Sequence, residues 1–328
     1  MESNHTSPKL KDSVTWGSDL YSNVSAVIIE DNSTVPSFDF TQLQFNYVTN
    51  FIFYVSTIFG IPGNIFILVL AFKSMRSSSL PYITFLAIFD LGILTIYIVV
   101  RYGNMNLQQY FLAHILDISR LITNWLLALL TIERCVAVCN PLRIRIRRTS
   151  TVRNTYISIT LVIVLSVVVS CLHLKTPSSI EELTESLAIS TLIQIVLPGT
   201  VMAVCTYLTV LRLRKYHLER RDLVHSSTLT RMSQSESDFT RLMILSCIFF
   251  CIFHLPVIVF AELLYLIQIF PVFAEPNTLR ALLAYLYIAI EVYVLNSAIN
   301  FYAYLIAAQG YRKQAAHLIR SMCRKSHQ

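Results

Sequence analysis

The chain has 328 residues, of which 55% are hydrophobic and only 14% charged. Soluble domains carry about 25% charged residues, so this composition indicates a membrane protein and argues against a soluble domain. The 26 Lys and Arg exceed the 19 Asp and Glu and give a net charge of +7, an excess that is typical of cytoplasmic loops on so apolar a chain and argues against a nucleic-acid partner.

Residues 1–46 come first and are polar, with many serines and acids. Asn4, Asn23 and Asn32 each begin an Asn-X-Ser/Thr sequon, which is glycosylated only where the chain is exposed on the lumenal or extracellular side. Such triplets also arise by chance, but their clustering favours a glycosylated extracellular tail.

Seven apolar segments follow, and each meets the length of about 20 residues that a helix needs to cross a hydrocarbon core about 30 Å thick. The third contains Asp117 and Arg120, so its prediction rests partly on a charge-free run after them. The predicted spans are Tyr47 to Phe72, Leu80 to Val100, Leu107 to Val138, Tyr156 to Leu174, Ser186 to Leu211, Leu242 to Ile269 and Leu282 to Ala308. The sequence thus predicts an all-α membrane protein with a seven-transmembrane helix bundle over residues 47–308.

The loops on one side of these spans, together with the segment 309–328, carry 20 of the 26 Lys and Arg, and the opposite side carries five. Positive residues near span ends stay on the cytoplasmic side. We therefore expect a multi-pass plasma-membrane protein with an extracellular N-terminus and a cytoplasmic C-terminus. Cys323, in the basic amphipathic stretch after the last span, is a candidate for palmitoylation or a plain thiol.

Ionisable and amide side chains inside the spans are costly in lipid and call for partners or a water-filled cavity. Asp90 lies near the middle of the second span, and Asn64, Asn296, Ser297 and Asn300 lie in the first and seventh. These oxygens suit either a monovalent cation or hydrogen bonds that join helices.

Asp117 and Arg120 lie one helical turn apart, so they can pair. With Glu291 and His254 they would line an outward-opening ligand cavity. The alternatives are a self-neutralised structural pair and a buried core histidine.

Short motifs recur in order along the spans: Gly63-Asn64, Leu86-Ala87-x-x-Asp90, Glu133-Arg134-Cys135 with Pro141-Leu142, Pro198, Phe250-x-x-Phe253-His254-Leu255-Pro256 and Asn300-Phe301-x-x-Tyr304. Together they resemble the rhodopsin-like (class A) family of G-protein-coupled receptors. The likeness runs from Tyr47 to Cys323 and is greatest to invertebrate neuropeptide receptors.

The resemblance implies roles for individual residues. It places Asp90, Thr123, Asn296, Ser297 and Asn300 in a pocket for an allosteric sodium ion, with no other cofactor and no other metal. It makes Arg134, Glu236, Phe250, Pro256 and Tyr304 the activation switch, in which Glu236 holds Arg134 at rest and the sixth helix swings outward at its proline. Arg134, Pro141 and Leu142 would contact a heterotrimeric G protein. A short amphipathic eighth helix would open near Tyr311.

Several residues depart from the family pattern. Gln109 stands where the family has the cysteine of its outer disulfide, and His254 and Phe301 replace a tryptophan and a proline. Asn124 stands where an aliphatic residue is typical. A divergent member of the family is therefore expected.

The class of ligand is restricted mainly by residues that the sequence lacks. The seventh span has no lysine, which excludes retinal, and Leu116 stands where amine receptors have a carboxylate. Acids on the outer side would attract a basic or amidated peptide, so a short neuropeptide is the preferred ligand. A chemosensory receptor for a small molecule is the alternative within the family.

Other classes of function have less support. A transporter could use Asp90 and Arg120 on a solute path, but inverted repeats are not visible. An intramembrane enzyme is disfavoured, since no metal-ligand or nucleophile motif is found. Seven serines and threonines between Ser226 and Ser237 suggest receptor kinases and arrestin as further partners, or a plain flexible loop.

Overall fold

A computed structural model describes residues 39–74, 80–102, 106–139, 148–172, 180–221, 227–270 and 276–307, with 312, 313, 316 and 320. Several predicted site residues lie outside this part of the chain. These are the sequon asparagines Asn4, Asn23 and Asn32, the loop residues Pro141 and Leu142, and Cys323, together with the side chain of Glu236.

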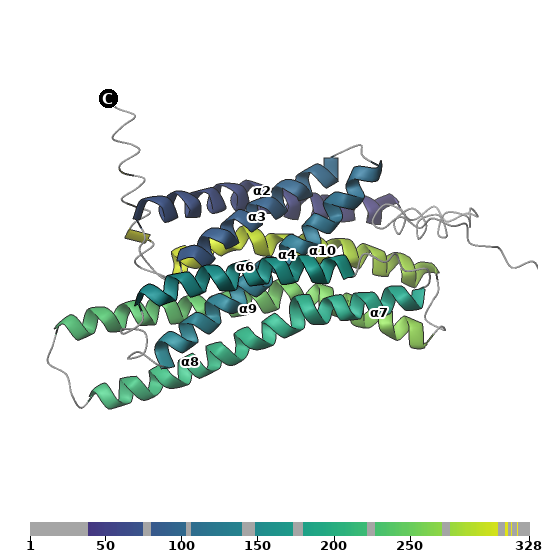
Figure 1. Cartoon of the computed structure of the whole chain (residues 1–328). Coiled ribbons are helices and arrows are strands. Elements are labelled where there is room, and N and C mark those ends of the chain that lie inside the picture. Colours follow the sequence, from purple (N-terminus) through teal and green to yellow (C-terminus); the bar gives the residue numbers. More distant parts are fainter. Residues whose placement is uncertain are drawn as a thin grey trace, which may run out of the picture.

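The described chain is helical almost throughout, and its long helices lie side by side (Figure 1). In order they are α2 (Asp39–Ser74), α3 (Leu80–Tyr102), α4 (Asn106–Cys139), α6 (Arg148–Leu172), α7 (Ile180–Thr191), the π-helical segment η1 (Leu192–Val196), α8 (Leu197–Arg221), α9 (Ser227–Ile269) and α10 (Pro276–Ala307). The predicted all-α class is confirmed.

Within the described residues, seven helical stretches are long and apolar enough to cross a membrane. They are Tyr47–Phe72, Leu80–Tyr102, His114–Cys139, Arg153–Leu172, Thr184–Lys215, Thr240–Ile269 and Ala284–Ala307. The seven predicted spans are therefore confirmed, with shifted ends. The third stretch, predicted over Leu107 to Val138, is described from His114 to Cys139.

The predicted eighth helix is not observed in the part of the chain that the structure describes. Within 309–328 the structure describes only Arg312, Lys313, Ala316 and Arg320, all exposed. Arg312 donates hydrogen bonds to the carbonyls of Leu305 and Ile306, 3.1 and 2.7 Å away, which lie in the last turn of α10. A cation at this position stabilises the negative end of the helix dipole.

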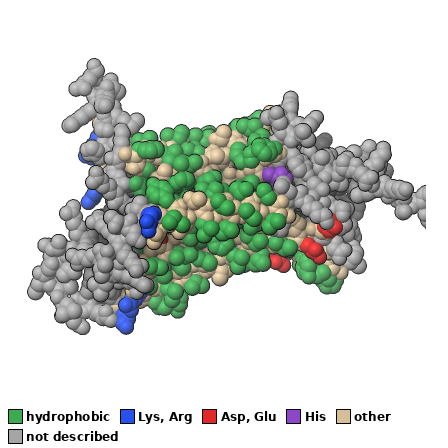
Figure 2. All heavy atoms as spheres, in the orientation of Figure 1, with side chains coloured by type: hydrophobic (Ala, Val, Ile, Leu, Met, Phe, Trp, Pro, Cys, Tyr) green, Lys and Arg blue, Asp and Glu red, His purple; other side chains and the backbone are tan. Residues whose placement is uncertain are grey.

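The outside of the bundle is apolar. Figure 2 shows a continuous hydrophobic band around the middle of the visible face, with blue basic side chains toward one end and acids and a histidine toward the other. Large apolar side chains such as Phe51, Phe72 and Leu172 are among the most exposed. Exposed apolar side chains are unfavourable in water but favourable in lipid. This surface therefore identifies a multi-pass membrane protein.

Helix α4 lies at the centre of the bundle and contacts α3, α6, α8, η1 and α9. The most extensive contact joins α2 and α10, where two glycines let the backbones approach. A Cβ on Gly60 would lie 3.0 Å from the Cα of Ala298, and one on Gly63 would lie 3.0 Å from the Cβ of Phe301. Small residues permit this close packing of membrane helices.

The fifth span changes its hydrogen bonding at η1, and the cause is Pro198. Proline has no N–H, so the carbonyl of Gln194 loses its donor one turn later. The N–H of Leu197 donates to the carbonyl of Leu192, five residues back. The carbonyl of Ile193, its usual acceptor four residues back, therefore lacks a helical donor as well. Two side chains of α4 donate hydrogen bonds to these carbonyls. Asn124 Nδ2 lies 2.7 Å from the Gln194 oxygen, and Trp125 Nε1 lies 3.2 Å from the Ile193 oxygen.

Candidate functional site

A cavity of about 250 Å³ lies toward the end of the bundle at which α4 begins, among α4, α6, α7, η1, α9 and α10. Its charged lining residues are Asp117 and Arg120, two of the four predicted ligand residues. The other residues that line it are His114, Leu121, Val169, Ser170, Ser186, Leu187, Ser190, Thr191, Ile193, Gln194, Ile195, Val257, Leu286, Ile290 and Tyr293.

Arg120 and Asp117 do pair, but loosely. Arg120 Nη1 lies 3.3 Å from Asp117 Oδ1, and the side chains are 12% and 53% exposed, respectively. The guanidinium carbon of Arg120 lies 4.8 Å from the centre of the Tyr293 ring, a cation–π contact. Its Nε and Nη2 are buried and have no hydrogen-bond partner among the described residues. The positive charge is thus far more enclosed than the negative one.

The predicted His254 does not line this cavity; it lies behind Tyr293. It is fully buried, and its ring meets the Tyr293 ring edge-on at 4.6 Å between centroids. It stacks on Phe250 at 3.9 Å, and its Nδ1 donates to the Phe250 carbonyl at 2.7 Å. Tyr293 therefore separates the cavity from the ring stack of α9, and its hydroxyl lies 3.2 Å from Asn124 Nδ2.

Glu291 does not line the cavity either. Its carboxylate, on the first turns of α10 within the membrane, forms an ion pair with Arg101 of α3 and accepts a hydrogen bond from Tyr97 at 2.7 Å. Arg101 also donates to Asn50 of α2 at 2.6 Å and lies over the Phe53 ring at 4.6 Å. Glu291 thus joins α10 to α2 and α3, since Arg101 reaches down from the end of α3.

The predicted polar cluster is assembled in the core. Asn300 Nδ2 donates to Asp90 Oδ2 at 2.7 Å, and Ser297 also hydrogen-bonds Asp90. Asn64 Nδ2 donates to the carbonyls of Ser297 and Gly60, at 2.9 and 3.0 Å. These bonds join α2, α3 and α10, as expected of interhelical contacts.

The cluster does not favour the expected sodium ion. A void of only about 10 Å³ lies beside Thr123, Asn296 and Ser297, and oxygens of this kind suit a monovalent cation. Arg120 lines the same void, however, and its positive charge would repel a cation bound there. Thr123 itself donates to the Arg120 carbonyl at 2.9 Å. The residues present therefore do not fit sodium well.

The predicted switch residues are spread along the bundle, from beside the charged cavity toward its other end. Arg134 of α4 borders a small void against Leu242, Met243 and Ser246 of α9. Phe250 and Tyr304 are buried in the core, and Phe250 packs on Gly199 of α8. Pro256 lies inside α9, two residues beyond His254 of the Phe250–His254 stack. Arg134 thus lines a void together with the helix that the resemblance expects to move.

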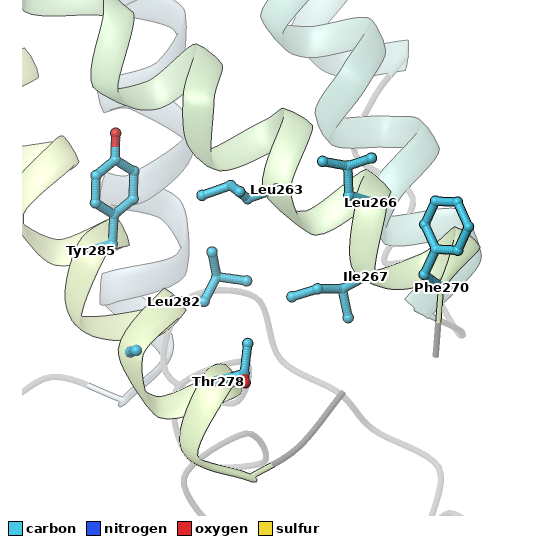
Figure 3. A pocket seen from close by; sticks show the side chains of 8 residues that line it. Leu263, Leu266, Ile267, Phe270, Thr278, Leu282 and Tyr285 are labelled. Carbon is cyan, nitrogen blue, oxygen red and sulfur yellow. The ribbon is translucent and has the colours of Figure 1, made fainter. Parts of the chain in front are cut away.

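A second, larger cavity of about 520 Å³ opens between the adjoining ends of α9 and α10. Figure 3 shows Leu263, Ile267 and Leu282 pointing toward one another between these helices. The remaining lining residues are Leu266, Phe270, Thr278, Ala281 and Tyr285. The lining residues that the structure describes are uncharged, so these residues offer shape and apolar contact.

Sequence reasoning missed three contributors. Arg101 lies one residue beyond the predicted second span, which ends at Val100, and no motif in the sequence points to Tyr293. Asn124 was noted only as a departure from the family pattern; its position in an apolar span was the signal that could have identified it, because an amide in lipid requires a partner. Neither models of known protein families nor curated proteins match this chain.

Proposed function

We propose that this protein is a divergent rhodopsin-like G-protein-coupled receptor. The observation that carries the proposal is that one helix, α4, contributes residues to two separate sites. Arg120 lines the charged cavity. Arg134 follows fourteen residues later, about 21 Å along the helix axis, and lines the small void against α9. The ordered motifs of the sequence add support, because each lies on the span where the family has it.

The contacts suggest how binding could reach the far end. A ligand in the cavity contacts Tyr293, whose ring lies against His254 of α9. Close to this stack, Pro256 removes one backbone hydrogen bond and allows α9 to bend. A ligand that binds better to the bent form shifts the population toward it. Movement of α9 away from Arg134 then opens the surface that a heterotrimeric G protein enters.

A short neuropeptide remains the preferred ligand class, with a small chemosensory ligand as the alternative. A cavity of about 250 Å³ is at the small end for drug-sized ligands, so it would take one end of a peptide. The exposed Glu185 and Glu262 lie toward the same end of the bundle and would contact its remaining, basic part. Figure 2 shows acidic side chains at this end.

The same charge distribution supports a plasma-membrane location with this end outside. The basic side chains in Figure 2 gather at the opposite end, as expected for a cytoplasmic face. In this proposal receptor kinases and arrestin act there on the serines and threonines at the start of α9.

The test is agonist-evoked nucleotide exchange on a panel of G proteins. Cells that express the chain are screened with a peptide library and a small-molecule library, using a second-messenger readout. Arg134→Ala should abolish exchange while agonist binding is largely retained. Arg153→Ala, an exposed arginine at the start of the fourth span, is the matched control and should couple normally.

Two results would contradict the proposal. One is unchanged exchange in the Arg134→Ala variant. The other is solute flux in reconstituted vesicles with no exchange on any G protein, which would favour a transporter.

A further inference from the structure

Arg120 holds a charge that its surroundings satisfy only in part. A guanidinium has five N–H donors, and burial without partners is costly because the solvation of the ion is lost. Its contact with Asp117 uses Nη1 alone at 3.3 Å, and this carboxylate is itself 53% exposed. The Tyr293 ring stabilises the charge through a cation–π contact, but a ring face does not replace a strong hydrogen-bond acceptor.

The two unpartnered atoms form one edge of the guanidinium. Nε–H and the adjacent Nη2–H point in nearly the same direction, and such a pair matches the two oxygens of a carboxylate. Both atoms are enclosed in the structure, while the residue as a whole lines the cavity. A ligand oxygen would therefore meet the Nη1 end first, and the side chain would turn to present this edge.

We propose that the cavity takes an anionic group, a carboxylate, and that Arg120 binds it. This inference rests on the proposed function, since it treats the cavity as a ligand site, and it names the chemistry of the ligand. In the complex the guanidinium leaves the Tyr293 ring and pairs with the carboxylate. Tyr293 then loses a contact on one side and keeps His254 on the other, which links the anion to α9.

The carboxylate has two sources, the free C-terminus of a peptide or a small organic acid. A peptide with basic residues ahead of a free C-terminus would satisfy both Arg120 and the acids at the outer end. An amidated peptide, which the acids on the outer side also allowed, would leave the buried charge of Arg120 unneutralised.

The test measures binding without any G protein. The full chain in lipid nanodiscs is titrated with 3-phenylpropionate and its neutral and cationic counterparts, 3-phenylpropionamide and 3-phenylpropylamine, and the thermal midpoint is followed. A second arm compares N-acetyl-phenylalanyl-leucine with its C-terminal amide. In at least one arm the acid should bind about tenfold or more tightly than the amide, because charged hydrogen bonds are the stronger ones. The arm that responds identifies the source.

Three variants separate binding from a structural role. Arg120→Gln should abolish the preference for the acid, and Arg120→Lys should weaken it, since lysine lacks the paired N–H groups. Asp117→Asn should tighten acid binding several-fold because a competing carboxylate is removed, and its exposed position makes folding secure. A purely structural Arg120–Asp117 pair predicts no such gain.

Equal binding of acid and amide, a preference for the amine, no midpoint shift with any probe, or an unchanged acid affinity in Asp117→Asn would each overturn the inference. Failure of the receptor proposal is distinguishable, because acid-selective binding in nanodiscs would then persist while no G protein responds.

Discussion

Asn124 of α4 donates a hydrogen bond to the carbonyl of Gln194, the group that Pro198 leaves without its helical donor. The distance is 2.7 Å, and the same amide also contacts the Tyr293 hydroxyl. An amide in the apolar third span therefore compensates for a proline in the fifth. The two positions are coupled across the helix interface that borders the charged cavity.

This coupling predicts a double-mutant cycle. Asn124→Leu should destabilise the protein by about 1–2 kcal/mol, since a buried carbonyl loses its donor. In Asn124→Leu/Pro198→Ala the new backbone N–H at position 198 supplies that donor, so the loss should be smaller than in Asn124→Leu alone. Denaturation in nanodiscs measures each variant. Strictly additive effects of the two substitutions would contradict the compensation.

The ion pair of Arg101 and Glu291 joins three helices, and its disruption should be costly. Arg101→Ala leaves a buried carboxylate unpaired and should lower stability by about 3–5 kcal/mol. The apolar double variant Arg101→Met/Glu291→Leu should recover most of this loss, because neither charge remains buried. Thermal midpoints in nanodiscs report the effect.

Tyr102→Phe is the control for that experiment. It removes an exposed hydrogen bond of 3.4 Å to Tyr54 near the same helix end and should be nearly neutral. If Arg101→Ala were equally neutral, the ion pair would contribute nothing to holding α10.

Two glycines offer a matched comparison of packing. In Gly60→Ala the new Cβ would lie 2.8 Å from the Cβ of Ala298 and 3.0 Å from its Cα, so α2 and α10 must separate and stability should fall by about 1–3 kcal/mol. At Gly92 no other described atom lies within 4 Å of the new Cβ, and Ala favours helix, so Gly92→Ala should be neutral or slightly stabilising. Equal midpoints for the two variants would argue against the close α2–α10 contact.

Sodium should have little effect on this protein, because Arg120 borders the void where the ion would lie. Replacing Na⁺ by N-methylglucamine at constant ionic strength should leave the thermal midpoint of the wild type unchanged. Arg120→Gln removes the repulsion and is the variant in which a sodium dependence could emerge. A sodium-dependent midpoint in the wild type that Asp90→Asn abolishes would instead establish the site expected from the resemblance.

The predicted orientation can be tested through the sequons. Glycosidase treatment of the protein from eukaryotic cells should increase its mobility, and replacement of Asn4, Asn23 and Asn32 by Gln should abolish that shift. A tag after residue 328 should be reached by antibody only after permeabilisation. A shift that survives all three substitutions, or a tag accessible on intact cells, would reverse the assignment.

Much of the fold could be predicted from the sequence, because the bilayer sets a minimum length for each apolar run and every backbone group must bond within its own helix. Polar side chains in apolar spans call for partners, and this predicts the cluster of Asp90 with Asn300 that the structure contains. The Asp117–Arg120 pair followed from helical spacing, which is a local property. The sequence therefore predicts the seven spans, the core polar cluster and one charged pair.

The partners of Glu291 and Asn124 were decided by the tertiary structure alone. Depth does not determine the direction in which a side chain points around its helix axis, and that direction depends on how α2, α3 and α10 pack. Glu291 therefore meets Arg101 instead of the cavity. The demand for a donor at Gln194 comes from Pro198, four residues along one helix, and is met by another helix seventy residues away. Hydrogen bonds between distant segments exist only once the bundle has brought them together.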